Sequence, residues 1–256
     1  IHLMAGNGDA GGQHPIPLGY NVRSALWELI AKVRPNAVIN CVGVIKQRPE
    51  AQDPLVMYSV NTIFPHKLAQ ICKAFGTRMV HFSTDCVFTG EVGNYADTAL
   101  SDAQDHYGRS KYAGEISSEG HVVTLRTSII GHEGRSRLAL IDWFLNSTGP
   151  VKGFKNAIFT GFPTVEVGTI LARHVLPNED RSGLFNMSAD PISKYDLLVK
   201  VREVYGKDIE IIGDDHVRID RSLDSSLFRA QFNYSPPDWD SLIARMHNDK
   251  PEFGAK

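Results

Sequence analysis

The chain has 256 residues, with 27 Lys and Arg against 29 Asp and Glu, for a formal net charge of −2. This length allows one large domain or two small ones with a substantial core. The balanced charge argues against nucleic acid or an anionic membrane surface as the main partner, because both need a basic excess. No apolar run approaches the ~20 residues that span a bilayer. Three scattered cysteines do not suit a disulfide framework or a zinc cluster, and a reducing, cytoplasmic setting is expected.

The first twenty residues are rich in glycine and proline. Residues 6–11 (GNGDAG) match the dinucleotide-binding pattern G-x-G-x-x-G. That pattern needs a strand before it and a helix directly after it, whose first amides hold the pyrophosphate. Pro15 and Pro17 follow instead, and proline interrupts a helix. We therefore expect an irregular tail over residues 1–20 and not a phosphate-binding loop.

From residue 21 onward, helical and strand patterns alternate. Apolar spacing predicts helices over 26–33, 54–75 (with a kink at Pro65), 105–119, 137–145, 165–175, 193–205 and 238–246. Short apolar runs predict strands over 37–42, 78–83, 122–126, 183–187 and 209–212. Strands that alternate with helices imply an α/β fold, a parallel sheet with helices on both faces.

Ligands of such sheets bind beyond the carboxyl ends of the strands. Tyr107 and Lys111 are four residues apart in a predicted helix and share one face, and Thr84 ends a buried strand before them. A phenol, an ammonium and a hydroxyl in one cleft suit proton donation to a carbonyl oxygen while hydride reaches the carbon. A nearby ammonium would lower the pKa of the phenol from its usual ~10. A solvated helix face also explains an isolated Tyr-x-x-x-Lys pair, so this alternative stays open here.

Other chemistries are poorly represented. The ten histidines show no metal-ligand spacing, so no metal site is predicted. The sequence contains neither a G-x-S-x-G elbow nor a G-x-x-x-x-G-K-[ST] loop, which disfavours hydrolase and P-loop functions.

Several segments carry a family resemblance. They read VINCVG (38–43), VNTIFPHKLA (60–69), HFSTDCVFTG (81–90) and YGRSKYAGE (107–115), with weaker matches at 125–131, 162–164, 183–188 and 220–243. In these segments the chain resembles the extended short-chain dehydrogenase/reductase family, and within it the dTDP-4-dehydrorhamnose reductase branch of nucleotide-sugar enzymes.

The resemblance implies a Rossmann-type nucleotide-binding domain over 21–130 and 156–190, with a small C-terminal α/β substrate lobe over 131–155 and 191–256. It implies NADP(H) or NAD(H) as cofactor and reduction of a 4-keto nucleotide sugar in polysaccharide or deoxysugar biosynthesis. The family opens with a glycine-rich βαβ unit that has no counterpart here. We therefore expect an N-terminally truncated sheet with an open strand edge, and whether the chain retains the cofactor stays open.

Carried over residue by residue, the resemblance assigns three catalytic roles. Thr84 would polarise the substrate oxygen, Tyr107 would donate the proton, and Lys111 would lower the pKa of Tyr107 and hold the nicotinamide ribose. The implied cofactor-binding residues are Asn40, Cys41, Val42, Gly43, Ser83, Tyr107, Lys111, Thr127, Ser128 and Ile129. The implied substrate-binding residues are Thr84, Asp85, Val87, Phe88 and Arg221. Asn61 would help to order a proton-relay water, and Cys86 stands where the branch usually has tyrosine.

Two alternative functions remain open at this point. The missing phosphate loop would suit a non-catalytic nucleotide-sugar-binding or regulatory module on the same fold. A related sugar-nucleotide epimerase or dehydratase would keep and regenerate its cofactor. In each case the expected partner is a nucleotide sugar, with no nucleic acid or membrane involved, and a homo-oligomer is allowed.

Overall fold

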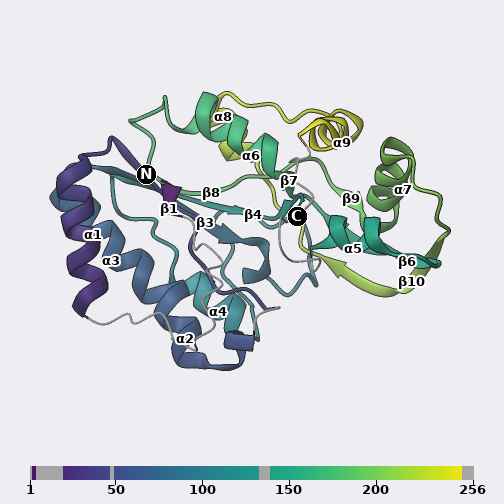
Figure 1. Cartoon of the computed structure of the whole chain (residues 1–256), viewed down its shortest axis with the longest axis horizontal. Helices are drawn as coiled ribbons and strands as arrows, with labels where there is room; N and C mark the ends of the chain where they lie inside the picture. Colours follow the sequence, from purple (N-terminus) through teal and green to yellow (C-terminus); the bar gives the residue numbers. More distant parts are fainter. Residues whose placement is uncertain (1, 4–19, 47–48, 133–138, 250–256) are drawn as a thin grey trace, which may run out of the picture. The chain divides into compact units, whose positions relative to one another are not determined.

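The computed structural model describes residues 2–3, 20–46, 49–132 and 139–249 (Figure 1). The glycine tract of residues 6–11 and most of the predicted tail lie outside these ranges. The chain folds into two compact units. Unit 1 comprises Ile1–Phe88, Leu100–Arg126 and Glu179–Phe185; unit 2 comprises Thr89–Ala99, Thr127–Asn178 and Asn186–Lys256.

Unit 1 is built on a five-stranded sheet in the order β1-β2-β3-β4-β8. The strands are β1 (His2–Leu3), β2 (Ala37–Asn40), β3 (Arg78–Thr84), β4 (Val122–Thr127) and β8 (Gly183–Asn186), the last residues of β4 and β8 belonging to unit 2. The helices are α1 (Tyr20–Val33), η1 (Pro49–Gln52), α2 (Pro54–Tyr58), η2 (Ser59–Ile63), α3 (Phe64–Ala74), η3 (Asp85–Val87) and α4 (His106–Ala113). The parallel pairing of β2 with β1 and with β3 fits the predicted sheet.

The core of unit 1 lies between this sheet and two of its helices. Ile30 of α1 and Leu68 of α3 are buried together with Val38 of β2 and Met79 of β3, and Figure 1 shows α1 and α3 lying beside each other. Burial of such side chains stabilises the fold by about 25 cal/mol per Å² of apolar surface. The packing holds the carboxyl ends of β2 and β3 next to each other.

The edge of β2 that was expected to be open is partly covered. His2 pairs with Ile39 and Leu3 pairs with Asn40, both in parallel register. The expectation of an open edge is therefore wrong over these two residue pairs, because a second strand satisfies the backbone groups there.

Two predicted helices differ from their expected form. The segment 54–75 continues from α2 to α3 through the π-helical turn η2, and Pro65 lies directly after this turn, at the beginning of α3. The helix predicted over 105–119 ends at Ala113, because Gly114 caps it with its backbone N–H directed to the carbonyls of Ser110 and Lys111. The last six residues of that prediction are wrong.

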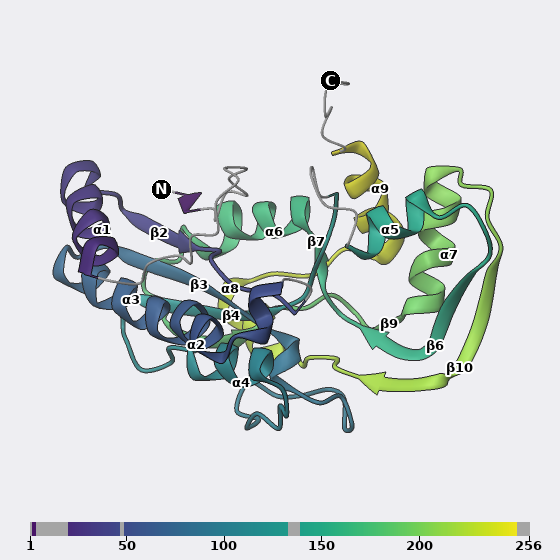
Figure 2. The same ribbon diagram turned by 60° about the horizontal axis from the view of Figure 1, so that its bottom comes forward.

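Unit 2 contains a three-stranded sheet in the order β10-β6-β9 and a two-stranded sheet, β5-β7. The strands are β5 (Ile129–Ile130), β6 (Val151–Phe159), β7 (Phe162–Pro163), β9 (Ile192–Ser193) and β10 (Ile211–Asp220). The helices are α5 (Leu140–Asn146), α6 (Thr164–Ile170), η4 (Leu171–Val175), α7 (Lys194–Tyr205), α8 (Ser226–Phe232) and α9 (Trp239–Asn248). Figure 2 shows β10 running beside β6, against which α7 packs.

Strand β6 and helix α8 were not predicted, and β10 is longer than the predicted 209–212. Along much of β6, buried residues alternate with more exposed ones. Its sequence VKGFKNAIF therefore lacks the continuous apolar run by which other strands were predicted. Gly153 lies in this strand where α7 comes close, because a β-carbon there would lie only 2.8 Å from the ring of Tyr195. Such a close approach favours glycine.

The domain bounds expected from the sequence differ from the two units. Residues 127–130 and 156–178 pack with unit 2, because β6 continues through residue 155 as one strand and because Glu166 of α6 binds Arg245 and Tyr234. Residues 89–99 also join unit 2, where Tyr95 exchanges backbone hydrogen bonds with Ser222 and Asp224. The functional assignment of each unit stays a prediction. In the described part of the chain, no helix is long and apolar enough to cross a membrane.

Candidate active site

Thr84 ends β3 and begins the short helix η3. Its backbone is extended, and its hydroxyl accepts a 3.1 Å hydrogen bond from the Cys86 amide, which caps η3. The same hydroxyl lies 3.2 Å from Oδ1 of Asp85, and the Thr84 side chain lies close enough to the phenol of Tyr107 to lower its pKa. The structure therefore brings together the strand-end hydroxyl and the phenol that the sequence singled out.

Tyr107 lies in the first turn of α4, and two contacts position that turn. Asp105 caps the helix by accepting a 2.8 Å hydrogen bond from the Gly108 amide, and Lys46 forms a 2.6 Å ion pair with Asp105. The Lys46 ammonium also lies 5.6 Å from the centre of the Tyr107 ring, within the range of a cation–π interaction. The segment after β2 thus contributes to the placement of Tyr107.

Gly108 allows α4 to approach η3 closely. A β-carbon at this position would lie 2.4 Å from the carbonyl oxygen of Cys86 and 2.5 Å from the β-carbon of Ala103. Both distances are too short for a methyl group, so only glycine lets the helix pack here. This close packing is what puts Tyr107 next to Thr84.

Lys111 follows Tyr107 by one helical turn and is buried, with 6% of its surface exposed. Its ammonium donates a 2.6 Å hydrogen bond to the carbonyl oxygen of Phe82. Burial lowers the pKa of Lys111 to about 8, while the nearby Glu115 and Cys41 act in the opposite direction. A lysine with this pKa is still largely charged at neutral pH.

The pKa of Tyr107 differs from the sequence-based expectation. Burial raises this pKa well above its usual range, and the neighbouring Cys86 adds to the rise, while the hydrogen bond with Thr84 opposes it. The prediction that Lys111 lowers the pKa of Tyr107 is wrong for this structure, because the Lys111 ammonium is directed to Phe82 and desolvation of the phenol dominates.

The segment after β2 is held by side chains of its neighbours. The Asn40 carboxamide accepts a 3.1 Å hydrogen bond from the Val42 amide and lies 3.0 Å from Nδ1 of His81. Cys41 is exposed at the surface. A β-carbon at Gly43 would lie 3.9 Å from Nζ of Lys111, so a side chain there would intrude on the space beside the ammonium.

Asn61 is fully buried and ties this segment to α4. Its Oδ1 accepts a 2.9 Å hydrogen bond from the Val44 amide, and its Nδ2 donates to the Val44 carbonyl and to the Ser110 hydroxyl, each at 3.1 Å. The side chain therefore joins the protein's own segments. The predicted role of Asn61 in ordering a water stays a prediction.

Four further predicted residues lie in the last residues of β3 or directly after it. Ser83 donates its hydroxyl to Glu115 at 2.7 Å, and Asp85 is buried beside Thr84. Val87 and Phe88 are fully buried. Their predicted contact with substrate stays a prediction.

Comparison with known proteins identifies the family to which the chain belongs. Residues 20–250 match the model of the RmlD substrate binding domain. The chain belongs to the RmlD substrate-binding domain family. The membership expected from the four sequence segments is thereby confirmed.

Curated relatives of this RmlD-family chain include two dTDP-4-dehydrorhamnose reductases. The protein of Mycobacterium tuberculosis H37Rv is 38% identical over 139 residues, which cover 50% of this chain and 45% of the relative. That of Streptomyces griseus is 36% identical over 98 residues, which cover 38% of this chain and 31% of the relative. The chain thus matches less than half the length of these relatives.

Solved structures share its fold. The dTDP-4-dehydrorhamnose reductase of Bacillus anthracis in complex with NADP has a TM-score of 0.77 at 17% identity, covering 89% of this chain and 85% of that one. A hypothetical dTDP-4-dehydrorhamnose reductase of Sulfolobus tokodaii has a TM-score of 0.73 at 23% identity, covering 91% and 88%. These likenesses confirm the predicted α/β fold of the Rossmann type.

The remaining predicted residues of the RmlD-family chain lie between the end of β4 and the start of β5, and after β10. Thr127 is buried, Ile129 is half exposed, and the Ser128 carbonyl accepts a 2.9 Å hydrogen bond from the Phe162 amide. These residues and Arg221 belong to unit 2. Their contact with the Thr84 and Tyr107 side chains of unit 1 stays a prediction.

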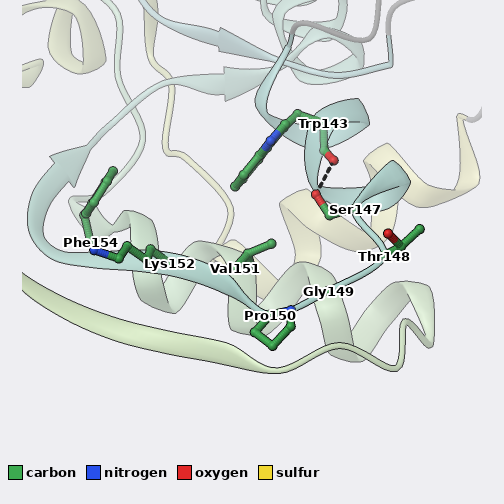
Figure 3. A pocket seen from close by; sticks show the side chains of 8 residues that line it. All are labelled: Trp143, Ser147, Thr148, Gly149, Pro150, Val151, Lys152 and Phe154. Atoms are coloured by element: carbon green, nitrogen blue, oxygen red, sulfur yellow. Dashed lines mark hydrogen bonds between the residues drawn. The ribbon is translucent and has the colours of Figure 1, made fainter.

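Unit 2 of the RmlD-family chain also has a cavity of its own, of about 550 Å³. Trp143, Val151 and Phe154 line it, and Figure 3 shows the Ser147 hydroxyl beside them, donating to the Trp143 carbonyl at 2.8 Å. None of the predicted site residues lines this cavity. In the described ranges, no group of three or more His, Cys, Asp or Glu side chains is arranged to hold a metal ion.

Sequence reasoning missed two buried charges of the RmlD-family site, Glu115 and Arg126. Glu115 lies four residues after Lys111 and eight after Tyr107, so the same spacing that linked those two residues also points to it. Arg126 is the only charged residue in the strand β4 (VVTLRT), and a buried charge requires a partner.

Proposed function

We propose that this chain belongs to a reductase that uses NADPH or NADH to reduce a 4-keto nucleotide sugar, as in dTDP-4-dehydrorhamnose reductases. The observation that carries the proposal is that Thr84 and Tyr107 lie close enough for Thr84 to lower the pKa of the phenol, with the Lys111 ammonium one turn further along α4. The names of the curated relatives support the substrate class.

The residues present fit the nicotinamide end of such a cofactor. The Lys111 ammonium has three hydrogens, of which it donates one to Phe82 within the described residues, and the others can serve ribose hydroxyls. Gly43 leaves space beside this ammonium that a β-carbon would fill. A bound nicotinamide would supply the hydride for the reduction.

The protein's own groups would handle the proton. The raised pKa keeps the Tyr107 phenol protonated at neutral pH, which is the form that can donate. Thr84 would share a hydrogen bond with the substrate oxygen and hold it near the phenol. As the proton leaves the phenol oxygen, negative charge develops there, and the Thr84 side chain, which acts to lower the pKa of Tyr107, would stabilise it.

A cytoplasmic location is part of the proposal. Cys41, Cys72 and Cys86 form no disulfide within the described residues, as is usual for cysteines in a reducing compartment. The nucleotide sugar is the proposed partner, and self-association of the chain is compatible with it.

The test is the reduction of dTDP-4-dehydrorhamnose, measured as loss of NADPH or NADH absorbance. Replacing Tyr107 by Phe removes the proton donor, so kcat should fall by about 10²–10⁴-fold while cofactor binding, measured by calorimetry, persists. Tyr112→Phe on the same helix is the matched control and should keep its activity. Unchanged turnover in Tyr107→Phe would rule the mechanism out.

A further inference from the structure

The last three residues of β3 are each held by one residue from α4 or the segment just after it. Thr84 lies close enough to Tyr107 to lower the pKa of its phenol, and the Phe82 carbonyl accepts a hydrogen bond from Lys111 at 2.6 Å. Ser83, between them, donates to Oε1 of Glu115 at 2.7 Å. Residues 107, 111 and 115, which are spaced four apart, thus contact three consecutive residues of β3.

Glu115 is itself anchored by a buried arginine on β4. Arg126 donates from Nε to Oε1 at 2.8 Å and from Nη2 to Oε2 at 2.7 Å. The side chains of Arg126 and Glu115 are only 3% and 5% exposed, and the guanidinium lies 5.1 Å from the centre of the Phe88 ring. A two-point contact of this kind fixes the carboxylate's orientation as well as its position.

Glu115 also differs from the other titratable groups that act on Lys111. Those groups are Cys41 after β2 and His81 on β3. Desolvation by neighbouring protein atoms raises the pKa of the Cys41 thiol although part of this residue is exposed, and burial lowers the pKa of the His81 imidazole, so both are neutral near pH 7. Among these groups, Glu115 alone places a negative charge near the buried ammonium.

We propose that Glu115 is a positioning residue that holds the Tyr107 and Lys111 side chains in line with Thr84 and supplies the negative charge that balances the Lys111 ammonium. The proposal rests on the function proposed above, because its purpose is to keep Lys111 charged beside the proton donor. Arg126 supports this role of Glu115 by holding its carboxylate in place.

A purely structural ion pair would have different consequences. Glu115→Gln and Arg126→Gln both break the pair, so a role in folding alone would lower the free energy of unfolding and kcat to a similar extent in the two variants. Their effects on Lys111 should be opposite. Glu115→Gln removes the balancing charge, whereas Arg126→Gln leaves the carboxylate without its arginine and free to act on Lys111 more strongly.

The experiment follows the ε-carbon of Lys111 by NMR in the full chain labelled with ¹³C-lysine, as a function of pH. The Lys111→Arg variant identifies the signal. The titration midpoint should lie near the value of about 8 in the unsubstituted chain, fall by roughly one pH unit in Glu115→Gln, and rise in Arg126→Gln. Midpoints that stay in place or move in the same direction in both variants would overturn the proposal.

If Glu115→Gln does not fold, Arg126→Gln still decides, because an unchanged or lower midpoint contradicts the proposal. The pH profile of kcat supplies a second readout, since its alkaline limb should follow the Lys111 midpoint in each folded variant. Opposite midpoint shifts in a chain without reductase activity would support the charge relationship and refute the proposed function. Reductase activity together with unchanged Lys111 midpoints would support the proposed function and refute the role of Glu115.

Discussion

The side-chain amide of Asn61 donates a 3.1 Å hydrogen bond to the hydroxyl of Ser110, so the π-helical turn η2 is joined to α4. The same amide holds both backbone groups of Val44. Gly114 permits this approach, because a β-carbon there would collide with the Asn61 carbonyl oxygen. One buried side chain thereby connects the segment after β2 with the helix that carries Tyr107.

Replacing Asn61 by Ala should lower the free energy of unfolding by roughly 2–4 kcal/mol, because it removes several buried hydrogen bonds and leaves the Val44 groups without their partner. Urea unfolding followed by circular dichroism measures the change. Asn146→Ala is the control, since the Asn146 amide makes an exposed hydrogen bond to the Asp142 carbonyl and should matter little. Equal losses in the two variants would contradict the role given to Asn61.

Gly108→Ala should destabilise the protein by about 1–3 kcal/mol, the usual range for overpacking, and should also reduce reductase kcat. The added methyl group would meet the Cys86 carbonyl oxygen and Ala103, which forces α4 away from Thr84. Thermal unfolding and the kinetic assay measure the two effects.

The matched control for that substitution is Gly168→Ala, in the helix α6. No heavy atom lies within 4 Å of a β-carbon there, so the helix should gain about 0.5–1 kcal/mol from the better helix former. A stabilised Gly108→Ala variant would show that α4 is not packed as closely as described.

Lys111 should make stability depend on pH in a defined window. Its folded pKa of about 8 lies below the ordinary value of 10.5, so between these pH values the unfolded chain binds more protons at this residue than the folded chain. The contribution of Lys111 to the free energy of unfolding therefore rises with pH across the window, by roughly 3 kcal/mol in total.

The contribution of Lys111 is isolated by comparing the unsubstituted chain with the Lys111→Met variant. The free energy of unfolding of each is measured in urea from pH 7 to pH 10. Subtracting the two curves removes the titration of groups that both proteins share. The difference should move in favour of the unsubstituted chain as the pH rises. A flat difference would mean that the Lys111 ammonium is not desolvated in the folded protein.

Much of the site could be predicted from the sequence because its elements are local. The apolar runs of β2 and β3 identified two adjacent strands whose ends carry Asn40 and Thr84, and a spacing of four residues placed Tyr107 and Lys111 on one helical face. Gly114 is a residue type that commonly ends a helix, but the helix predicted over 105–119 extended beyond it. The fold and the family followed from segments of this kind.

The electrostatics of the site could not be predicted in the same way. The order of the residues already shows that a phenol, an ammonium and a hydroxyl occur at spacings that suit one site. The rise in the pKa of Tyr107 follows only from the folded chain, because desolvation and the neighbouring Cys86 come from packing α4 against η3. Likewise, Lys111 is directed to Phe82, and Glu115 meets Ser83 and Arg126, through contacts between segments that no local pattern specifies. Burial and charge depend on the whole surroundings of a group, and those surroundings exist only once the strands and helices have packed.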